Sequence, residues 1–446
     1  MSPIVTVVGG GLAGCEAAVQ LARRGVRVRL MEMRPLRATP AHQTDGLGEL
    51  VCTNSFKSED PQNAHGQLKR EMRALGSVLL ASADRTRVPA GSALAVDRHL
   101  FSQAMTEAVA AEGAIEVVRE EITALPEGPA VVATGPLTSE ALSAAVLVAL
   151  GDGGLAFHDA IAPIVHRDSL DESVVFQAGR FGEDADYLNC PMSRDEYQAF
   201  VSALRAADVH EGHDWDAVPY FEGCLPIEVM AARGVDTLRF GPMKPIGLTD
   251  PRTGRRPWAV VQLRREDRAG QMWNLVGFQT RLRMGEQKRV FGMIPGLAGA
   301  EFLRWGSIHR NSYLDFPRCL TPHGSLRARA DLIFAGQLTG VEGYTESAAS
   351  GILAGLNLAR VLEGKEPVVP PPSTMLGALL RYLREGAPDR FQPMNSNWGL
   401  VDPLPEAIRD KQAKREALAR RAQEEFLGWM DGHGLGPAGS APAGVE

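Results

Sequence analysis

The sequence predicts an α/β fold with an inserted α+β domain, and three observations lead to this prediction. Residues 3–32 read as a strand, a helix and a second strand in close succession. Residues 328–360 read as another strand, a glycine-rich turn and a long helix of small residues. The long stretch between these two units does not repeat the pattern, as is typical of an inserted domain.

The length sets the domain organisation. A chain of 446 residues is too long for one ordinary hydrophobic core, so more than one domain is expected. We place the first part of the α/β domain at residues 1–140, the insertion at 141–325, and the closing part with C-terminal helices at 326–430, with approximate boundaries. Residues 403–430 have apolar residues at helical spacing and predict an amphipathic helix. Residues 431–446 are rich in Gly, Pro and Ala and are predicted to be disordered.

The first β-α-β unit carries a dinucleotide-binding pattern, because the apolar run PIVTVV ends at GGGLAG and a helix follows. Gly9 permits a tight turn, Gly11 lets a pyrophosphate approach the main chain, and Gly14 allows close packing of helix on strand. The N-terminus of the helix adds a favourable dipole for the phosphates. Glu32 ends the second strand, 18 residues after Gly14, where a carboxylate is expected to bind the ribose hydroxyls of an adenosine.

Two further stretches favour FAD over NAD as the dinucleotide. The run PAVVATGP at 129–136 is an apolar strand that ends at Gly135, as in flavoproteins whose chain returns to the sheet at this point. In the unit at 328–360, Gly336 lies in the turn and Gly351 in the helix, whose N-terminus suits the negative charge of a reduced flavin. The predicted fold class is therefore a Rossmann-like FAD-binding domain of the two-dinucleotide-binding flavoprotein type, with an inserted α+β domain. A plain closing β-α unit is the alternative for residues 328–360.

Composition and charge exclude some function classes. No stretch of about 18 uncharged apolar residues is present, so no membrane span is predicted. No basic segment precedes the first strand, and we expect a cytoplasmic protein. The net charge of −7 argues against general coating of nucleic acid but allows a local basic face. The five cysteines form no C-x-x-C pair, so they are read as reduced thiols and no metal site is predicted.

Two cysteines lie in polar, turn-like surroundings rather than in apolar runs. Cys52 lies in ELVCTNSFKSED and Cys224 in YFEGCLPIEVMA. A reactive thiol needs partial exposure and a neighbour that favours the thiolate. Lys57 is such a neighbour for Cys52, whereas the carboxylates near Cys224 are not. An inert buried thiol is the alternative interpretation of each.

Almost the whole chain, residues 3–430, resembles the folate- and FAD-dependent tRNA (uracil-5-)-methyltransferases. The resemblance rests on the stretches VVGGGLAGCEAA, ELVCTNSFKSED, YFEGCLPIEVMA, LRFGPMKPIGL, QTRLRMGEQKRVFGMIPGLAGAEFLRWGSIHRNSYL and FAGQLTGVEGYTESAASG. A larger flavoprotein that acts on the wobble uridine of tRNA resembles the cofactor-binding part but lacks this combination of cysteine stretches.

The resemblance implies a particular reaction. The family converts the T-loop uridine of tRNA to 5-methyluridine, with 5,10-methylenetetrahydrofolate as carbon donor, reduced FAD as reductant, and NADPH or NADH as electron source. It implies that Cys224 adds to uracil C6 and that Cys52 is the general base, although the reverse assignment remains open from sequence. It also implies a structural role for Cys190, and we read Cys15 and Cys319 as packing thiols.

The remaining site residues fall into three sets. By resemblance, Tyr344 and Glu346 belong to the turn at the flavin. The folate or substrate set is His309, Asn311 and Arg283. Because positive charge is concentrated in this stretch, Arg281, Lys288 and Arg289 are predicted to contact tRNA. The alternative is that these residues form an ordinary solvated surface.

The expected partners are tRNA, through its T arm, and folate; no membrane contact and no obligate protein partner are expected. The sequence leaves two other functions open. One is a flavoprotein that modifies another tRNA uridine, at the wobble position. The other is a non-catalytic, FAD-stabilised tRNA-binding protein or chaperone, against which the two cysteine stretches argue.

Overall fold

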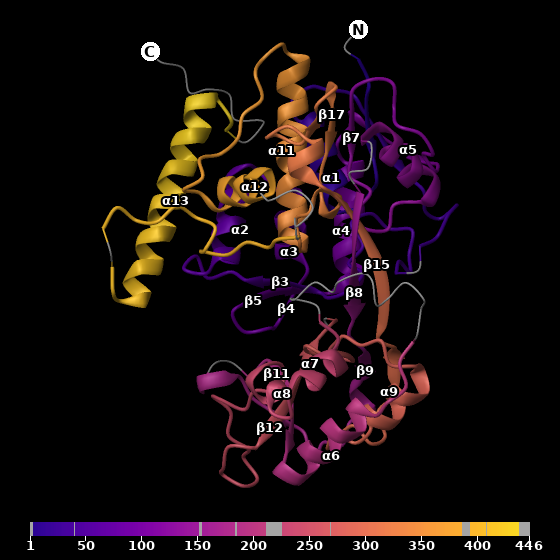
Figure 1. The fold of residues 1–446 in the computed structure, drawn as a ribbon, viewed down its shortest axis with the longest axis vertical. Helices are drawn as coiled ribbons and strands as arrows, with labels where there is room; N and C mark the ends of the chain where they lie inside the picture. The colour runs from indigo at the N-terminus through magenta and orange to yellow at the C-terminus, as the bar shows by residue number, and fades with distance from the viewer. Residues whose placement is uncertain are drawn as a thin grey trace.

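The computed structural model describes residues 3–39, 41–150, 154–182, 185–210, 225–267, 269–385, 393–406 and 408–436, and excludes the side chains of 154–161 and 308–312. The described residues form two regions (Figure 1). A six-stranded sheet and most of the helices make up the upper region, and a second six-stranded sheet makes up the lower one.

The first sheet has the strand order β16-β17-β7-β1-β2-β6. Its strands are β1 (Val5–Val8), β2 (Val28–Glu32), β6 (Ile115–Arg119), β7 (Ala130–Val132), β16 (Ser325–Leu326) and β17 (Arg329–Phe334). All neighbours pair in parallel except β16 and β17. Because helices cover a parallel sheet on both faces, its central strand β7 is apolar and fully buried.

Helices α1 (Leu12–Ala22) and α11 (Tyr344–Leu362) pack against each other backbone to backbone (Figure 1). A Cβ atom at Gly351 would lie 2.2 Å from the carbonyl oxygen of Ala13, and one at Gly355 would lie 2.5 Å from that of Ala17. The small residues noticed in the sequence therefore serve close packing. This contact brings the N-termini of both helices to the same edge of the sheet.

A first prediction tests this contact. Gly351→Ala is expected to destabilise the fold by about 2–4 kcal/mol, because the added methyl group meets backbone atoms that cannot move aside. The matched control is Gly428→Ala in helix α13, where the added Cβ has no atom within 4 Å. That change is expected to stabilise the protein by about 0.5–1 kcal/mol. Urea unfolding of both variants checks the pair, and equal midpoints would contradict the prediction.

Further helices surround the first sheet, together with a small sheet of order β3-β5-β4. These elements are α2 (Ala64–Ala74), α3 (Val78–Arg85), α4 (Arg98–Ala110), α5 (Glu140–Leu150), α10 (Phe316–Cys319), α12 (Met375–Glu385), α13 (Lys411–His433), β3 (Ser55–Ser58), β4 (Arg87–Val88) and β5 (Ala93–Val96). Two buried glutamates bind helix N-termini from a distance in sequence. Glu16 accepts from Val78 and Leu79 of α3, and Glu71 accepts from Met375 and Leu376 of α12.

These glutamates give a pH prediction. Burial raises the pKa of Glu71 to about 7, against backbone hydrogen bonds that lower it, and burial raises the pKa of Glu16 to the same value. A carboxyl that binds its proton more tightly when folded stabilises the fold below its unfolded pKa and loses that contribution as pH rises to 7. Unfolding free energy is therefore expected to fall between about pH 4.5 and pH 7, by of order 1–3 kcal/mol per group. Glu71→Gln should flatten this decline, measured by urea unfolding across the window; an unchanged slope would contradict the assignment.

The second sheet is antiparallel, with the order β10-β11-β12-β13-β9-β14. Its strands are β9 (Ile164–His166), β10 (Phe176–Gln177), β11 (Tyr187–Met192), β12 (Ala259–Arg265), β13 (Met272–Leu275) and β14 (Phe302–Arg304). Its helices are α6 (Arg194–Arg205), α7 (Ile227–Arg233), α8 (Thr237–Phe240) and α9 (Met284–Phe291), with short 3-10 turns at Arg167–Ser169 and Arg180–Gly182. A further 3-10 turn, Gln337–Thr339, follows β17 in the first region. A ribbon of β8 (Gly154–Ile161) and β15 (Ser307–Leu314) runs between the two regions (Figure 1).

Each region has its own hydrophobic core. The second core contains residues from Val165 to Leu297, whereas Leu142, Val146 and Tyr313 join the core of the first sheet. The domain boundaries at 140/141 and 325/326 stay a prediction. Within the described part of the chain, no helix has both the length and the apolar character needed to span a membrane.

The C-terminal segment corrects two expectations. The helix predicted over 403–430 begins only at Lys411, because Asp410 caps it by accepting from the Ala413 amide and two prolines precede it. The tail predicted to be disordered from residue 431 is helical through His433, and Leu435 is buried. Residues 437–446 lie outside the described residues.

Candidate active site

The glycine turn between β1 and α1 leaves the helix N-terminus open. Gly9 has φ 106°, and a Cβ at Gly14 would lie 1.8 Å from the Gly9 carbonyl oxygen, so both positions require glycine. Gly11 has no atom within 4 Å of its would-be Cβ, and as N-cap it has no side chain to cover the helix end. A ligand can therefore approach the main chain here.

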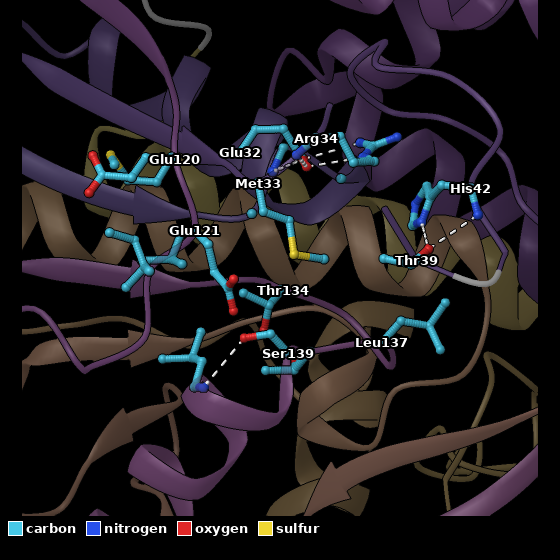
Figure 2. A pocket seen from close by; sticks show the side chains of 18 residues that line it. Glu32, Met33, Arg34, Thr39, His42, Glu120, Glu121, Thr134, Leu137 and Ser139 are labelled. Atoms are coloured by element: carbon cyan, nitrogen blue, oxygen red, sulfur yellow. Dashed lines mark hydrogen bonds and ion pairs between the residues drawn. The ribbon is translucent and has the colours of Figure 1, made fainter. Parts of the chain in front are cut away.

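A first hollow lies in front of this turn (Figure 2). Gly9, Gly11, Glu32, Arg34 and Thr134 are among the residues that line it. The Glu32 carboxylate accepts from the Gly10 amide at 2.9 Å and from the Arg34 Nε at 3.0 Å. Burial alone would raise the pKa of Glu32, but hydrogen bonds from Arg34 and its positive charge hold that pKa below its usual value. A permanently negative carboxylate at this edge suits ribose hydroxyls.

A second hollow continues from the first, because Gly11, His42, Thr134 and Leu137 line both. Its other walls come from residues far apart in the chain, among them Val51, Gly135, Gly336, Tyr344 and Ser347. Burial, and then the charge of Arg34, lower the pKa of His42 to about 4, so its imidazole is neutral near pH 7. Two joined hollows that meet at an uncapped helix N-terminus fit an extended dinucleotide such as FAD.

Cys52 lies beside the second hollow, against Tyr344. Its thiol donates to the Tyr344 hydroxyl oxygen at 3.0 Å, and its amide N–H donates to the same oxygen at 2.8 Å. Burial, followed by the charge of Cys52, raises the pKa of Tyr344 well above its usual value. Tyr344 therefore stays neutral and holds both the backbone and the thiol of Cys52.

Two guanidinium groups add positive charge near Cys52. Burial opposes the charge of Arg98 and Arg304, but both interact favourably with Cys52 and Tyr344. Arg98 donates to the Leu50 carbonyl oxygen and, at 2.8 Å, to the carboxylate of Glu266. Such surroundings favour a negative charge on a thiol. Lys57, which the sequence offers for this role, helps to lower the pKa of Glu346; its effect on Cys52 stays a prediction.

The second sheet fixes the Cys52 loop. Arg264, at the end of β12, donates to the Thr53 hydroxyl at 2.5 Å and to the Asn54 side-chain oxygen at 3.1 Å. Asn54 in turn donates to the Arg265 carbonyl oxygen at 2.9 Å. The position of Cys52 therefore depends on both regions of the molecule.

The other predicted site residues do not line the two hollows or have no described side chain. Glu346 is fully buried and lines neither hollow; its carboxylate accepts from the Ser396 amide at 3.0 Å and hydroxyl at 2.7 Å. His309 and Asn311 are in β15, with their side chains outside the described residues. Cys15, Cys190 and Cys319 are buried, as expected of packing thiols.

Cys224 lies outside the described residues, but the chain on either side of its segment is fixed. The amide of His210 donates to the Arg281 carbonyl oxygen at 2.9 Å, and that of Ile227 donates to the Gln279 carbonyl oxygen at 2.7 Å. The described residues that flank Cys224, His210 and Ile227, therefore bond to the same stretch of backbone, residues 279–281.

The predicted basic cluster lies in the second region. Arg283, Lys288 and Arg289 are exposed at helix α9, and Arg289 pairs with Glu286 at 2.5 Å. Arg281 lies 3.7 Å from Glu228. Arg283 lines neither of the two hollows.

Sequence reasoning missed several charged residues of the site. They are Arg34, His42, Glu49, Arg98, Glu266 and Arg304. Glu49 lies within the stretch ELVCTNSF, and Arg34 follows Glu32 by two residues, so proximity to known motifs was a usable signal. Arg98, Glu266 and Arg304 carry no local pattern, because only the fold brings them to Cys52.

Comparison with known proteins shows which family the chain belongs to. The protein from Geobacter sulfurreducens named methylenetetrahydrofolate–tRNA-(uracil-5-)-methyltransferase TrmFO is 55% identical over 433 residues, which are 96% of this chain and 99% of that protein. The protein of the same name from Thermus thermophilus is 55% identical over 428 residues, 96% of each chain. The chain belongs to the TrmFO family. A family model described as glucose inhibited division protein A also matches, over residues 4–366.

A solved structure confirms the predicted fold class for this TrmFO family member. The structure of Aquifex aeolicus GidA in crystal form II has a TM-score of 0.68 and 17% sequence identity, and the match covers 97% of this chain and 75% of that one. Form I of the same protein gives a TM-score of 0.66 with 19% identity. At this identity the likeness concerns the fold alone.

Proposed function

We propose that this chain methylates C5 of the T-loop uridine of tRNA to 5-methyluridine, with 5,10-methylenetetrahydrofolate as carbon donor and reduced FAD as reductant. The observation that carries the proposal is Cys52, held by Tyr344 at the edge of a dinucleotide-shaped hollow, in a chain 55% identical to proteins named for this reaction.

We assign the two cysteines different chemical roles on the uracil ring. C5 of uracil is a weak nucleophile until a thiolate adds to C6, and we assign this addition to Cys224. The methylene carbon bonds to C5 as its bonds to the folate nitrogens break, which releases tetrahydrofolate. The C5 proton must then leave, and we assign its removal to Cys52. Loss of that proton and release of the Cys224 thiolate restore the 5,6 double bond.

The described residues prepare Cys52 for proton transfer. Tyr344 fixes the thiol, and the positive charges of Arg98 and Arg304 favour the thiolate that accepts the proton. When bound, reduced FAD supplies the two electrons that convert a methylene group into a methyl group, and NADPH or NADH regenerates it. Gly11, Glu32, Gly135 and Gly336 are proposed to hold the FAD.

The substrate and folate assignments remain those of the sequence. Folate or substrate is proposed to contact His309, Asn311 and Arg283, and tRNA to contact Arg281, Lys288 and Arg289. The exposure of Arg283, Lys288 and Arg289 supports contact with an anionic ligand.

One experiment tests the reaction as a whole. The purified flavin-containing protein is incubated with unmodified tRNA, isotopically labelled methylenetetrahydrofolate and NADPH, and the RNA is then digested. Label in 5-methyluridine at the T loop is the expected result. Label at a wobble uridine would replace the proposal with the other enzyme function, and tRNA binding without any label would favour a non-catalytic protein.

A further inference from the structure

A third hollow lies between helices α2 and α13, away from the two hollows of the flavin site. We call it the α2–α13 pocket. Its walls are Gln62, Asn63, Ala64, His65, Ser396, Asn397, Trp398, Gly399, Lys411, Lys414, Arg415 and Leu418. It shares no lining residue with either flavin-site hollow. In Figure 1, α13 is the long yellow helix beside α2 and α12, and it packs against α2.

The charged side chains of α13 that line this pocket are all positive. Lys411, Lys414 and Arg415 come from the first turns of α13 and are exposed. Within the described residues, no carboxylate lies within ion-pair distance of these three side chains. The nearby carboxylate of Glu416 accepts instead from Gln62 and Gln412, at 3.0 and 3.1 Å. Three cations that face a hollow without acidic partners form a site for an anion.

The opposite wall adds further groups that suit phosphate. Helix α2 begins here, so its N-terminal dipole points into the region of the cations. The Asn63 side chain caps α2 by accepting from the His65 amide at 3.2 Å, and the Asn397 side chain bonds within its own loop, to Asn395 and Gly399. The half-buried Trp398 is fixed by its indole N–H, which donates to the Gln62 carbonyl oxygen at 2.8 Å. Proteins that bind single-stranded nucleic acid hold the phosphates with cations and stack bases on aromatic rings, and this pocket offers both kinds of group.

Two residues that line the pocket also contact the buried carboxylate of Glu346, in the helix that carries Tyr344. His65 lies 3.3 Å from the Glu346 carboxylate and 2.6 Å from the Ser396 hydroxyl, and both His65 and Ser396 line the pocket. Two residues before Glu346, at the start of helix α11, Tyr344 holds Cys52 beside the second hollow. A long RNA can occupy both places at once.

From this arrangement we infer that the α2–α13 pocket binds the phosphate backbone of the RNA whose uridine enters the flavin site. The inference rests on the proposed function for the identity of that RNA. It adds a contact surface on α2 and α13, in the first region, to the basic cluster on α9 in the second.

The test uses the full-length, flavin-containing protein and a fluorescent T-arm RNA hairpin, with affinity measured against salt concentration. Arg415→Gln is compared with Arg420→Gln, an exposed arginine of the same helix that does not line the pocket. Both variants lose one positive charge. Arg415→Gln is expected to make the plot of log affinity against log salt less steep by about 1, and Arg420→Gln to leave it unchanged. The triple variant Lys411→Gln, Lys414→Gln, Arg415→Gln should lower the slope by about 2–3 and the affinity by roughly tenfold or more.

The outcomes separate this inference from the proposed function. Equal slopes for Arg415→Gln and Arg420→Gln, with the triple variant at the wild-type slope, would overturn the inference even if the protein methylates tRNA. A weaker apparent affinity for NADPH with unchanged RNA binding would also overturn it and assign the pocket to a free nucleotide. If the slopes change as expected but no uridine is methylated, the RNA site stands and the proposed reaction fails. Flavin absorbance and melting temperature confirm that the variants are folded.

Discussion

Cys224→Ala is expected to abolish the covalent adduct between the protein and a tRNA that carries 5-fluorouridine at the target position. Fluorine at C5 cannot leave as a cation, so the wild-type reaction stops with the RNA attached to the attacking cysteine. Removal of the thiol that adds to C6 removes the attachment itself. The measurement is a denaturing gel of protein and labelled RNA, in the presence of methylenetetrahydrofolate and NADPH.

Cys52→Ala is the matched variant. It should still form the adduct with the fluorinated RNA, while methylation of ordinary tRNA falls by about 10²–10⁴-fold because no base removes the C5 proton. An adduct that persists in Cys224→Ala and disappears in Cys52→Ala would reverse the two roles. An adduct in neither wild type nor variants would remove covalent catalysis from the proposal.

Gly11→Val is expected to give a folded protein that lacks flavin. Gly11 has φ −76° and ψ −172°, which any residue adopts, and its would-be Cβ meets no protein atom within 4 Å. The added side chain therefore projects into space that the proposed FAD needs. We expect flavin binding at least about 100-fold weaker, equivalent to about 3 kcal/mol, with little change in melting temperature of the flavin-free protein.

The control for Gly11→Val is Gly113→Val, at another position where a Cβ meets nothing, remote from both hollows. Visible flavin absorbance per protein and titration with FAD provide the measurement. Full flavin content in purified Gly11→Val would show that the turn does not carry the dinucleotide. Equal loss in both variants would point to a general effect of the larger side chain.

The local part of the fold was predictable from sequence. Gly9 and Gly11 lie between a strand and a helix and Gly14 lies in the first turn of that helix, as predicted, and the Glu32 carboxylate accepts from the Gly10 amide. These features depend on short-range backbone geometry, which the order of residues determines. The helix at the C-terminus began later than predicted because a capping aspartate, rather than apolar periodicity, determines where it starts.

The surroundings of Cys52 were not predictable in the same way. Arg98 begins an ordinary helix, Glu266 follows a strand of the other sheet, and Arg304 belongs to β14. Nothing in their own neighbourhoods distinguishes them from surface charges. Their role arises from packing between distant parts of the chain. Glu346, placed at the flavin by resemblance, turned out to have its carboxylate occupied by Ser396 and His65.

The second hollow is built from two parts of the chain that are synthesised far apart in time. One wall is contributed by residues up to Leu137, and the other by residues from Gly336 to Ser347. A chain emerging from the ribosome therefore completes the second sheet long before it can close this hollow, since domains fold as units during synthesis. The cofactor has a complete site only once α11 has been made and has packed onto α1. Capture of the proposed FAD therefore requires a chain extended past α11, and a protein truncated before that helix is expected to be colourless.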